Sequence, residues 1–438
     1  MIRVIAVLAF VLTAAFAAPS QAMTIERIVS PSGIEAWLVR DKAAPLVAMS
    51  YSFHGGTSQD DATKPGTANL TSSLLDEGAG DLDAKAFQQR VESRAIELSF
   101  SVSRDYFNGT LRTLSENRDE AFNLLRLALA SPRFDTEAVE RVRTQIVSGL
   151  RRDETNPNTL ASRNWWSAAF PNHPYGQESK GTLASVPQIT VEDMRDYLRR
   201  VLARNELKIA IVGDVDPQSA GALIDRAFGS LPAKNDLRPI LATNPRGLGR
   251  RIVTTVGVPQ AVVTFGGPGL GRNDPDFMAA YIVNHVLGGG SFSSRLYREV
   301  REKRGLAYGV SESLVWFKNS AVTIGGTAVR AEKTGDAIAI IEQEVKRMAE
   351  DGPTADELAR AKSYLKGAYP LSLDTSSKIA SQLVHIQNDN LGIDYIQRRD
   401  SMIDAVTIED AKRAAKRLYG SGLLVTVAGQ PQGVTSTD

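Results

Sequence analysis

Hydrophobic and polar residues alternate along this chain in two series that follow similar orders. Each series opens with the period-two alternation of a strand, passes through a helical region, returns to two strand patterns and continues with two helical patterns. Because consecutive strands precede consecutive helices, the pattern predicts the α+β class: two homologous domains, each a largely antiparallel sheet packed with helices.

The first series predicts strands over residues 46–53, 95–103, 107–114 and 206–212, and helices over 67–75, 118–130, 136–150 and from Val191. The second series predicts strands over 261–265, 306–317 and 321–329, and helices over 275–287, 293–304, 335–349 and 354–366.

Short sequence matches indicate that the second series is a copy of the first. Residues 189–193 (ITVED) recur as 406–410 (VTIED), and Gly109-Thr110 recurs as Gly326-Thr327, both 217 residues later. Residues 135–143 match 354–362 at an offset of 219, and Val212-Gly213 matches Ala428-Gly429 at 216. Four matches in one order predict a duplicated fold.

The copies predict a division of the chain. We expect one domain over residues 23–230, a linker over 231–250 and a second domain over 251–438. The linker prediction rests on Pro232, Pro239, Pro245, Gly247 and Gly249, since Pro and Gly at that density disfavour regular structure.

Residues 1–22 have the features of a cleavable signal peptide. Arg3 is followed by an apolar run over residues 4–18 and by the small-x-small sequence Ser20-Gln21-Ala22. The run is shorter than the about 20 residues that cross a bilayer. We therefore expect a periplasmic or secreted protein with no integral membrane segment after cleavage.

Composition narrows the possible chemistry. The 438 residues include no Cys and 4 His, which excludes disulfides, thiolate zinc sites and a cysteine nucleophile and leaves little room for a multi-histidine metal centre. Lys and Arg number 51 against 50 Asp and Glu, for a formal charge of +1, which excludes a strongly basic nucleic-acid binder.

Residues 293–308 (SSRLYREVREKRGLAY), preceded by Gly288-Gly289-Gly290, resemble a run in the second domain of the pitrilysin/insulinase family of zinc peptidases. Residues 53–58 (FHGGTS) and 65–68 (PGTA) resemble the lead-in to that family's metal helix. The resemblance covers nearly the whole mature chain and is strongest to the short two-domain form, which includes the mitochondrial processing peptidase subunits. It implies a duplicated α/β roll.

The family's zinc ligands are absent from the matching positions. Catalytic members carry H-x-x-E-H on one helix, where two histidines four residues apart share a zinc ion and the glutamate activates its bound water. This sequence has Asn69, Ser72 and Ser73 there, and the third ligand, a glutamate, falls near Ser148-Gly149. We expect no metal in this chain, because amides and hydroxyls are poor zinc ligands.

The second-domain signature is complete. Active members use an Arg and a Tyr seven residues apart, and the matching residues are Arg301 and Tyr308. We expect Arg301 in the last turn of a helix, Gly305 at its end and Tyr308 at the start of the next strand. There a guanidinium and a phenol could hydrogen-bond a substrate carbonyl and its developing oxyanion. The alternative is a solvated charge run beside a core aromatic.

Three functional hypotheses remain. The first is a subunit without metal that supplies Arg301 and Tyr308 to the zinc site of a homologous H-x-x-E-H partner, for hydrolysis of peptides or unfolded segments. The second is a non-catalytic scaffold or peptide-binding homologue. The third, an independent hydrolase, is weakest, because neither Ser72 nor Ser73 lies in the glycine pattern of a nucleophile elbow. Gly288–Gly290 lack the Lys-Ser/Thr of a phosphate loop, which favours a turn or a flexible substrate loop.

Overall fold

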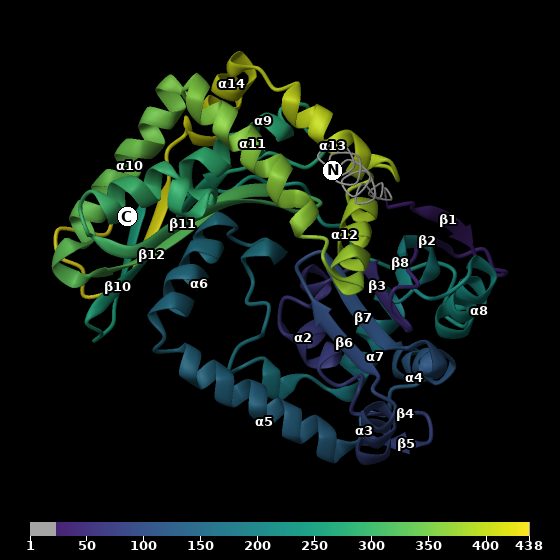
Figure 1. Ribbon diagram of the computed structural model, residues 1–438. Coiled ribbons are helices and arrows are strands. Elements are labelled where there is room, and N and C mark those ends of the chain that lie inside the picture. The colour runs from purple at the N-terminus through teal and green to yellow at the C-terminus, as the bar shows by residue number, and fades with distance from the viewer. Residues whose placement is uncertain (1–22, 438) are drawn as a thin grey trace, which may run out of the picture.

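The computed structural model describes residues 23–437, so the predicted signal peptide lies outside the described residues. Two mixed sheets dominate the fold (Figure 1). The first has the strand order β1-β2-β8-β3-β7-β6 and the second the order β11-β12-β10-β13-β9. The first sheet consists of β1 (Glu26–Val29), β2 (Glu35–Arg40), β3 (Leu46–His54), β6 (Glu97–Val102), β7 (Tyr106–Leu114) and β8 (Lys208–Gly213). The second consists of β9 (Arg251–Thr255), β10 (Gln260–Pro268), β11 (Ala307–Trp316), β12 (Ala321–Arg330) and β13 (Leu424–Gly429).

The two sheets share one plan, which confirms the predicted duplication within the α+β class. Read from its other end, the second sheet (β9-β13-β10-β12-β11) repeats the order β2-β8-β3-β7-β6 of the first. In each sheet one neighbouring pair is parallel, β2 with β8 and β9 with β13, and the other neighbours are antiparallel. The sheets are therefore largely but not wholly antiparallel.

The sequence matches have physical causes in the structure. Thr190 and Thr407 each close a capping box with an aspartate three residues on, which satisfies free N–H groups at the start of a helix. Gly213 and Gly429, which end β8 and β13, have φ of 145° and 147°. A Cβ at Gly213 would lie 2.2 Å from the Leu46 carbonyl oxygen. Only glycine fits the conformation and the approach.

Helices cover both sheets (Figure 1). The first half contains α2 (Thr67–Ser72), α3 (Ala84–Ser93), α4 (Arg118–Ala130), α5 (Thr136–Asp153), α6 (Pro157–Ala169), α7 (Val191–Val201) and α8 (Pro217–Phe228), and a short hairpin of β4 (Gly78–Ala79) and β5 (Leu82–Asp83). The second contains α9 (Phe277–Asn284), α10 (Thr334–Asp351), α11 (Ala355–Leu371), α12 (Ser376–Asn388), α13 (Tyr395–Asp404) and α14 (Ile408–Tyr419). Among the described residues no helix is long and apolar enough to span a membrane.

Each half lends one helix to the sheet of the other half. Helix α6 packs against β10 and β13, and α12 packs against β3 and β8. Trp165 of α6 is fully buried and donates a hydrogen bond of 3.1 Å to the Leu424 carbonyl oxygen. Gln387 of α12 donates one of 2.9 Å to the Ile209 carbonyl oxygen. Each exchanged helix thus covers a sheet face that the opposite half leaves open.

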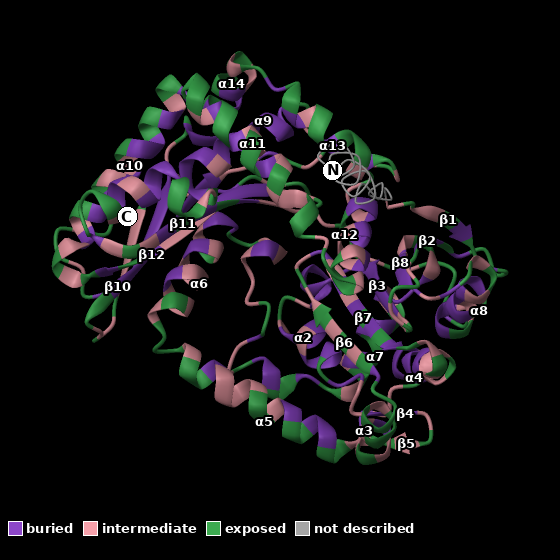
Figure 2. Ribbon diagram, viewed as in Figure 1, coloured by how far each residue is buried: buried purple, intermediate pink, exposed green. Residues whose placement is uncertain are grey.

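Buried residues fill the space between each sheet and its helices (Figure 2). One large apolar cluster lies in each half, centred on residues such as Phe53 and Phe122 in the first and Phe265 and Val283 in the second. A smaller cluster joins the halves, because Trp37 and Val212 of the first sheet pack with residues of α12. Residues 231–250, the predicted linker, contain no helix or strand.

Three predicted helices differ from the structure. The helix predicted over 67–75 ends at Ser72, because the Ser72 and Ser73 hydroxyls donate to the Asn69 carbonyl oxygen and the chain tightens into turns. The helix predicted over 275–287 is α9 followed by a π-helical turn, η6 (His285–Gly289). The helix predicted over 293–304 contains a second π-helical segment, η8 (Tyr297–Glu302). Single π turns are frequent at functional sites.

We expect Trp165→Ala to lower the free energy of unfolding by about 3–5 kcal/mol, because it leaves a large cavity between α6 and the second sheet. Urea unfolding followed by circular dichroism measures the change. Leu241→Ala, at a side chain that is 78% exposed, is the control and should stay within about 0.5 kcal/mol of the parent. Equal stability of W165A and the parent would contradict a structural role for the exchanged helix.

Candidate functional site

Helix α2 occupies the place of the family's metal helix but offers no metal ligands. Asn69 is half-buried, Ser72 is buried and Ser73 is exposed. The Ser72 and Ser73 hydroxyls donate hydrogen bonds of 3.0 and 2.9 Å to the Asn69 carbonyl oxygen. Zinc prefers thiolate, imidazole and carboxylate ligands. These three positions therefore do not fit a zinc ion.

The surroundings of α2 supply no substitute. The position of the third ligand falls on α5, where Ser148 and Gly149 carry no carboxylate. Within residues 23–437 no group of three or more His, Asp or Glu side chains could hold a metal ion. The helix is nevertheless firmly placed: the buried Asp60 carboxylate accepts hydrogen bonds of 2.8 Å from the Gly66 and Ala68 N–H groups. Burial raises the pKa of Asp60 to about 7, although both hydrogen bonds oppose the shift.

The structure brings Arg301 and Tyr308 together. Arg301 lies in η8, and its guanidinium carbon is 4.4 Å from the centre of the Tyr308 ring and 4.9 Å from that of Tyr297. The guanidinium also donates a hydrogen bond to the Tyr297 hydroxyl. The Tyr308 side chain is 85% exposed. The pair therefore forms a stacked cation and phenol at the protein surface.

The chain between the two residues turns as predicted. Gly305 has a φ of 58°, in the left-handed region, and β11 begins at Ala307. The register of β11 against β12 shifts between Ala307 and Val310, so one extra residue is accommodated at Tyr308 and Gly309. A bulge of this kind turns a side chain out of the regular alternation of a strand. Sequence reasoning missed Tyr297, although its spacing of four residues from Arg301 was a usable signal.

The neighbouring basic side chains lie beside carboxylates, and among them Arg301 is the exception. Lys303 and Arg304 each lie 2.7 Å from a carboxylate oxygen of Glu299. Arg298 lies within 4.0 Å of two carboxylates. Among the described residues Arg301 has aromatic partners and no carboxylate. The segment is therefore not a uniformly solvated charge run.

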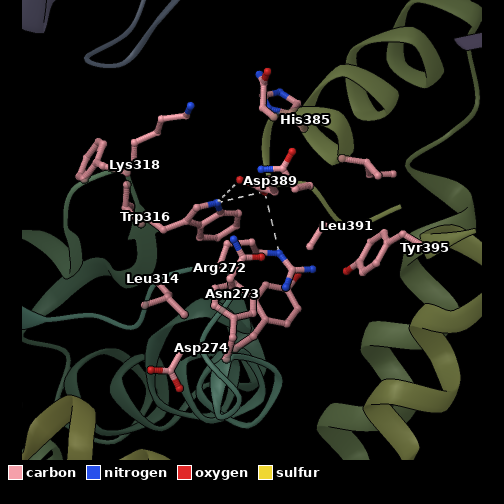
Figure 3. A pocket seen from close by; sticks show the side chains of 18 of the residues that line it. Arg272, Asn273, Asp274, Leu314, Trp316, Lys318, His385, Asp389, Leu391 and Tyr395 are labelled. Carbon is pink, nitrogen blue, oxygen red and sulfur yellow. Dashed lines mark hydrogen bonds and ion pairs between the residues drawn. The ribbon is translucent and has the colours of Figure 1, made fainter. Parts of the chain in front are cut away.

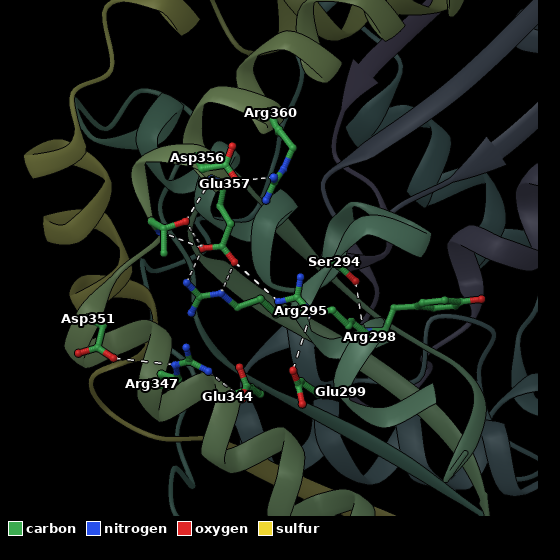
Figure 4. Close-up of polar contacts among 12 residues, drawn as sticks. Ser294, Arg295, Arg298, Glu299, Glu344, Arg347, Asp351, Asp356, Glu357 and Arg360 are labelled. Carbon is green, nitrogen blue, oxygen red and sulfur yellow. Dashed lines mark hydrogen bonds and ion pairs between the residues drawn. The ribbon is translucent and has the colours of Figure 1, made fainter. Parts of the chain in front are cut away.

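A buried ion pair anchors this segment to α11 (Figure 4). Arg295 donates hydrogen bonds of 2.8 and 2.6 Å to the two carboxylate oxygens of Glu357, and the Arg295 side chain is 4% exposed. Glu357 also accepts a hydrogen bond of 2.9 Å from the Thr354 N–H in a capping box. Burial alone would raise the pKa of Glu357, but these hydrogen bonds outweigh it and lower the pKa to about 2.

Gly288 to Gly290 have a packing role beside this segment. A Cβ at Gly288 would lie 2.6 Å from the Cβ of Glu312, and one at Gly290 would lie 2.8 Å from the His285 carbonyl oxygen. Glu312 is 1% exposed and accepts hydrogen bonds from Tyr419 and Asn284. Burial raises the pKa of Glu312 to about 7. Gly288 lets η6 approach β11 and Gly290 lets the chain fold back on the start of η6, which favours a structural turn over a flexible substrate loop.

A separate cavity of about 1070 Å³ lies between the two halves. It is lined by residues from the β6–β7 turn, the loop before α9, the end of β11 and the α11–α13 region, and it contains neither Arg301 nor Tyr308. Figure 3 shows Arg272, Asp389 and Trp316 near its centre. No sequence motif indicated this cavity, because its walls come from four distant segments.

We expect Glu357→Gln to destabilise the protein at pH 7, because it leaves the Arg295 guanidinium buried without its counter-charge. The folded pKa of about 2 lies below the ordinary value of 4.5, so the contribution of Glu357 is complete above about 4.5 and is lost as the pH falls toward 2. Urea midpoints between pH 2 and 7 measure the gap between parent and E357Q. Glu350→Gln, at an exposed carboxylate, is the control. A gap that does not narrow with acid would contradict this account.

Comparison with known proteins identifies two family matches. The family described as Insulinase (Peptidase family M16) matches residues 36–183, and the one described as Peptidase M16 inactive domain matches residues 188–365. The first match lies within the first half, and the second begins near the end of the first half and covers much of the second.

Individual relatives match over most of their length. The non-peptidase homologue YmxG of Helicobacter pylori is 30% identical over 335 residues, which cover 76% of this chain and 77% of that protein. The mitochondrial-processing peptidase subunit beta of Lentinula edodes is 24% identical over 389 residues, covering 83% and 80%. A crystal structure of a peptidase M16 inactive domain from Pseudomonas fluorescens superposes with a TM-score of 0.87 at 27% identity, covering 95% of this chain and all of that one. This chain therefore belongs to the insulinase (peptidase M16) family, as a short two-domain member in which Asn69, Ser72 and Ser73 replace the zinc motif.

Proposed function

We propose that this protein is the subunit without metal of a heterodimeric periplasmic zinc metallopeptidase, in which Arg301 and Tyr308 contact a substrate bound at the zinc site of the partner subunit. The partner is a homologous chain that carries H-x-x-E-H, and the substrate is a peptide or an unfolded protein segment. The single observation that carries the proposal is an asymmetry. The metal positions have lost every ligand, whereas Arg301 and Tyr308 are present and stacked together.

The chemistry of the pair fits contact with a peptide. A guanidinium has five N–H donors, and Arg301 uses one on the Tyr297 hydroxyl, so others remain for a substrate carbonyl oxygen. The Tyr308 hydroxyl is a further donor on an exposed ring. Donors that are held in place before reaction stabilise the charge that develops on a carbonyl oxygen during hydrolysis.

Pairing with a second chain is supported by the relatives. The Lentinula edodes relative is named a subunit, of a processing peptidase. The predicted signal peptide at residues 1–22 supports a periplasmic location, where the partner would also reside.

A second candidate function is a non-catalytic scaffold or peptide-binding homologue. The names of the Helicobacter pylori relative, a non-peptidase homologue, and of the Pseudomonas fluorescens structure, an inactive domain, favour it. A scaffold of this kind would assemble and function without the Arg301 guanidinium or the Tyr308 hydroxyl.

We expect Arg301→Ala and Tyr308→Phe each to lower kcat/KM of the heterodimer by about 100-fold or more, because each removes a donor to the reacting carbonyl. The measurement is cleavage of a fluorogenic peptide by this chain co-expressed with an H-x-x-E-H homologue. Arg360→Ala and Tyr364→Phe, at exposed side chains of α11, are matched controls and should leave cleavage unchanged. Unchanged kcat/KM in both test variants, with the heterodimer intact, would support the scaffold instead.

We expect metal analysis of the native complex to give about one zinc per heterodimer and none in this chain alone, because Asn69, Ser72 and Ser73 do not fit zinc. Inductively coupled plasma mass spectrometry on each purified species measures the ratio. Stoichiometric zinc in the isolated chain would overturn the assignment of the metal to the partner.

A further inference from the structure

The cavity between the halves has a buried cation at its centre. Arg272, in the loop before α9, lines the cavity with a side chain that is only 8% exposed (Figure 3). Its guanidinium carbon lies 4.3 Å from the centre of the Phe277 ring and 5.1 Å from that of Tyr395. Two aromatic rings thus fix the guanidinium in place.

The N–H donors of Arg272 are not satisfied within the described chain. Its nearest carboxylate oxygen, on Asp389, lies 3.9 Å from Nε, which is beyond hydrogen-bond distance. Arg272 forms no hydrogen bond with any residue of the range 23–437. The guanidinium nitrogens keep some contact with the cavity, since none of them is a fully buried atom without a partner, so they are free to donate to a ligand that enters it.

Asp389 is held by a different partner. The Trp316 indole N–H lies 3.2 Å from each of its carboxylate oxygens. Burial raises the pKa of Asp389 above its ordinary range. Asp389 therefore offsets part of the positive charge of Arg272 but accepts no hydrogen bond from the Arg272 guanidinium.

The other charged groups of the lining are already paired. Asp105 accepts hydrogen bonds of 2.6 and 2.8 Å from the Tyr175 hydroxyl and the backbone N–H of Lys318. The Lys318 ammonium lies 3.7 Å from a carboxylate oxygen of Glu206. Asp274 pairs with Arg417, and Arg399 donates to the Leu365 carbonyl oxygen. Burial lowers the pKa of His385, so its ring adds no charge at neutral pH. Among the buried charges of this lining, the Arg272 guanidinium is the one without a hydrogen-bond partner, and its geometry fits a planar anion.

We propose that this cavity binds the C-terminal carboxylate of a short peptide, with Arg272 as its receptor and the surrounding aromatic rings as the site for the last side chain. A carboxylate matches the planar fork of a guanidinium and carries the opposite charge. The volume of about 1070 Å³ exceeds what a single amino acid requires, and the aromatic rings of Phe277, Trp316 and Tyr395 offer apolar contact. The site lies within one chain, so it does not depend on the proposed peptidase partner.

Isothermal titration calorimetry on the full mature chain tests this proposal. The probes are the tetrapeptide acetyl-Ala-Ala-Ala-Phe with a free C-terminal carboxylate and the same peptide as the C-terminal amide. We expect the acid to bind at least about tenfold more tightly than the amide. The carboxylate has a negative charge and two oxygens that accept hydrogen bonds from the guanidinium, whereas the amide is neutral and has one such oxygen. Equal affinity of the two peptides, or no binding of the acid at millimolar concentration, would overturn the proposal.

Two variants separate recognition from folding. Arg272→Gln should weaken binding of the acid by at least about tenfold and leave binding of the amide unchanged. Asp389→Asn should tighten binding of the acid several-fold, because it removes a repelling charge while its amide oxygen still accepts the Trp316 N–H. Thermal unfolding checks that each variant is folded. If R272Q does not fold, the D389N variant provides the test. Damage to the structure would not raise the affinity for the acid, so tighter binding by D389N supports the proposal. Unchanged or weaker binding of the acid by D389N would contradict it.

Discussion

The reciprocal exchange of α6 and α12 is the constraint on which the rest of the structure depends. Each half builds a sheet with helices on one face, and the other face stays open until a helix of the opposite half covers it. The covering is apolar and hydrogen-bonded: Trp165 reaches the Leu424 carbonyl oxygen and Gln387 reaches that of Ile209. Burial of two sheet faces at once ties the stability of each half to the other.

The exchange of α6 and α12 also determines where the cavity between the halves lies. With α12 fixed on the first sheet, the chain after it places Asp389 opposite Arg272 and Trp316, which belong to the second half. The cavity between the halves is thus a product of the crossover. Arg301 and Tyr308 lie outside this cavity, and their position depends on a different anchor, the buried pair of Arg295 and Glu357. Two different sets of contacts therefore position the two candidate sites.

Local signals in the sequence predicted much of the fold. The capping boxes at Thr190 and Thr407 act within four residues, and Gly213 and Gly429 mark strand ends that only glycine can form. The same holds for Arg301 and Tyr308, because one tight turn with Gly305 at its corner separates them. Such features depend on nearest neighbours along the chain, which the sequence displays directly.

Features that depend on distant segments escaped prediction. The helical period over 293–304 shows no sign of the π-helical turn, since that turn arises where η8 packs against β11. Helix α2 ends early because the Ser72 and Ser73 hydroxyls donate hydrogen bonds to the Asn69 carbonyl oxygen. The spacing of apolar residues contains no information about these side-chain hydrogen bonds. The cavity joins the β6–β7 turn to residues more than 200 positions away, so no window along the chain could contain it.

Three arginines of the second half show how burial and partners separate structural from ligand-facing roles. Each stacks on an aromatic ring: Arg399 on Tyr369, Arg301 on Tyr308 and Arg272 on Phe277. Arg399 is buried and donates to a backbone carbonyl, so its donors serve the fold.

Arg301 lies beside an exposed tyrosine, so water can accept hydrogen bonds from its free N–H groups. The free-energy cost of leaving these groups without a protein or ligand acceptor is therefore small. Arg272 is mostly buried, lines the cavity and has no carboxylate oxygen within hydrogen-bond distance, so its donors are open to a ligand that enters the cavity. Stacking alone is therefore uninformative about function, and what distinguishes Arg272 from a packing residue is that its donors face a cavity and have no acceptor from the chain.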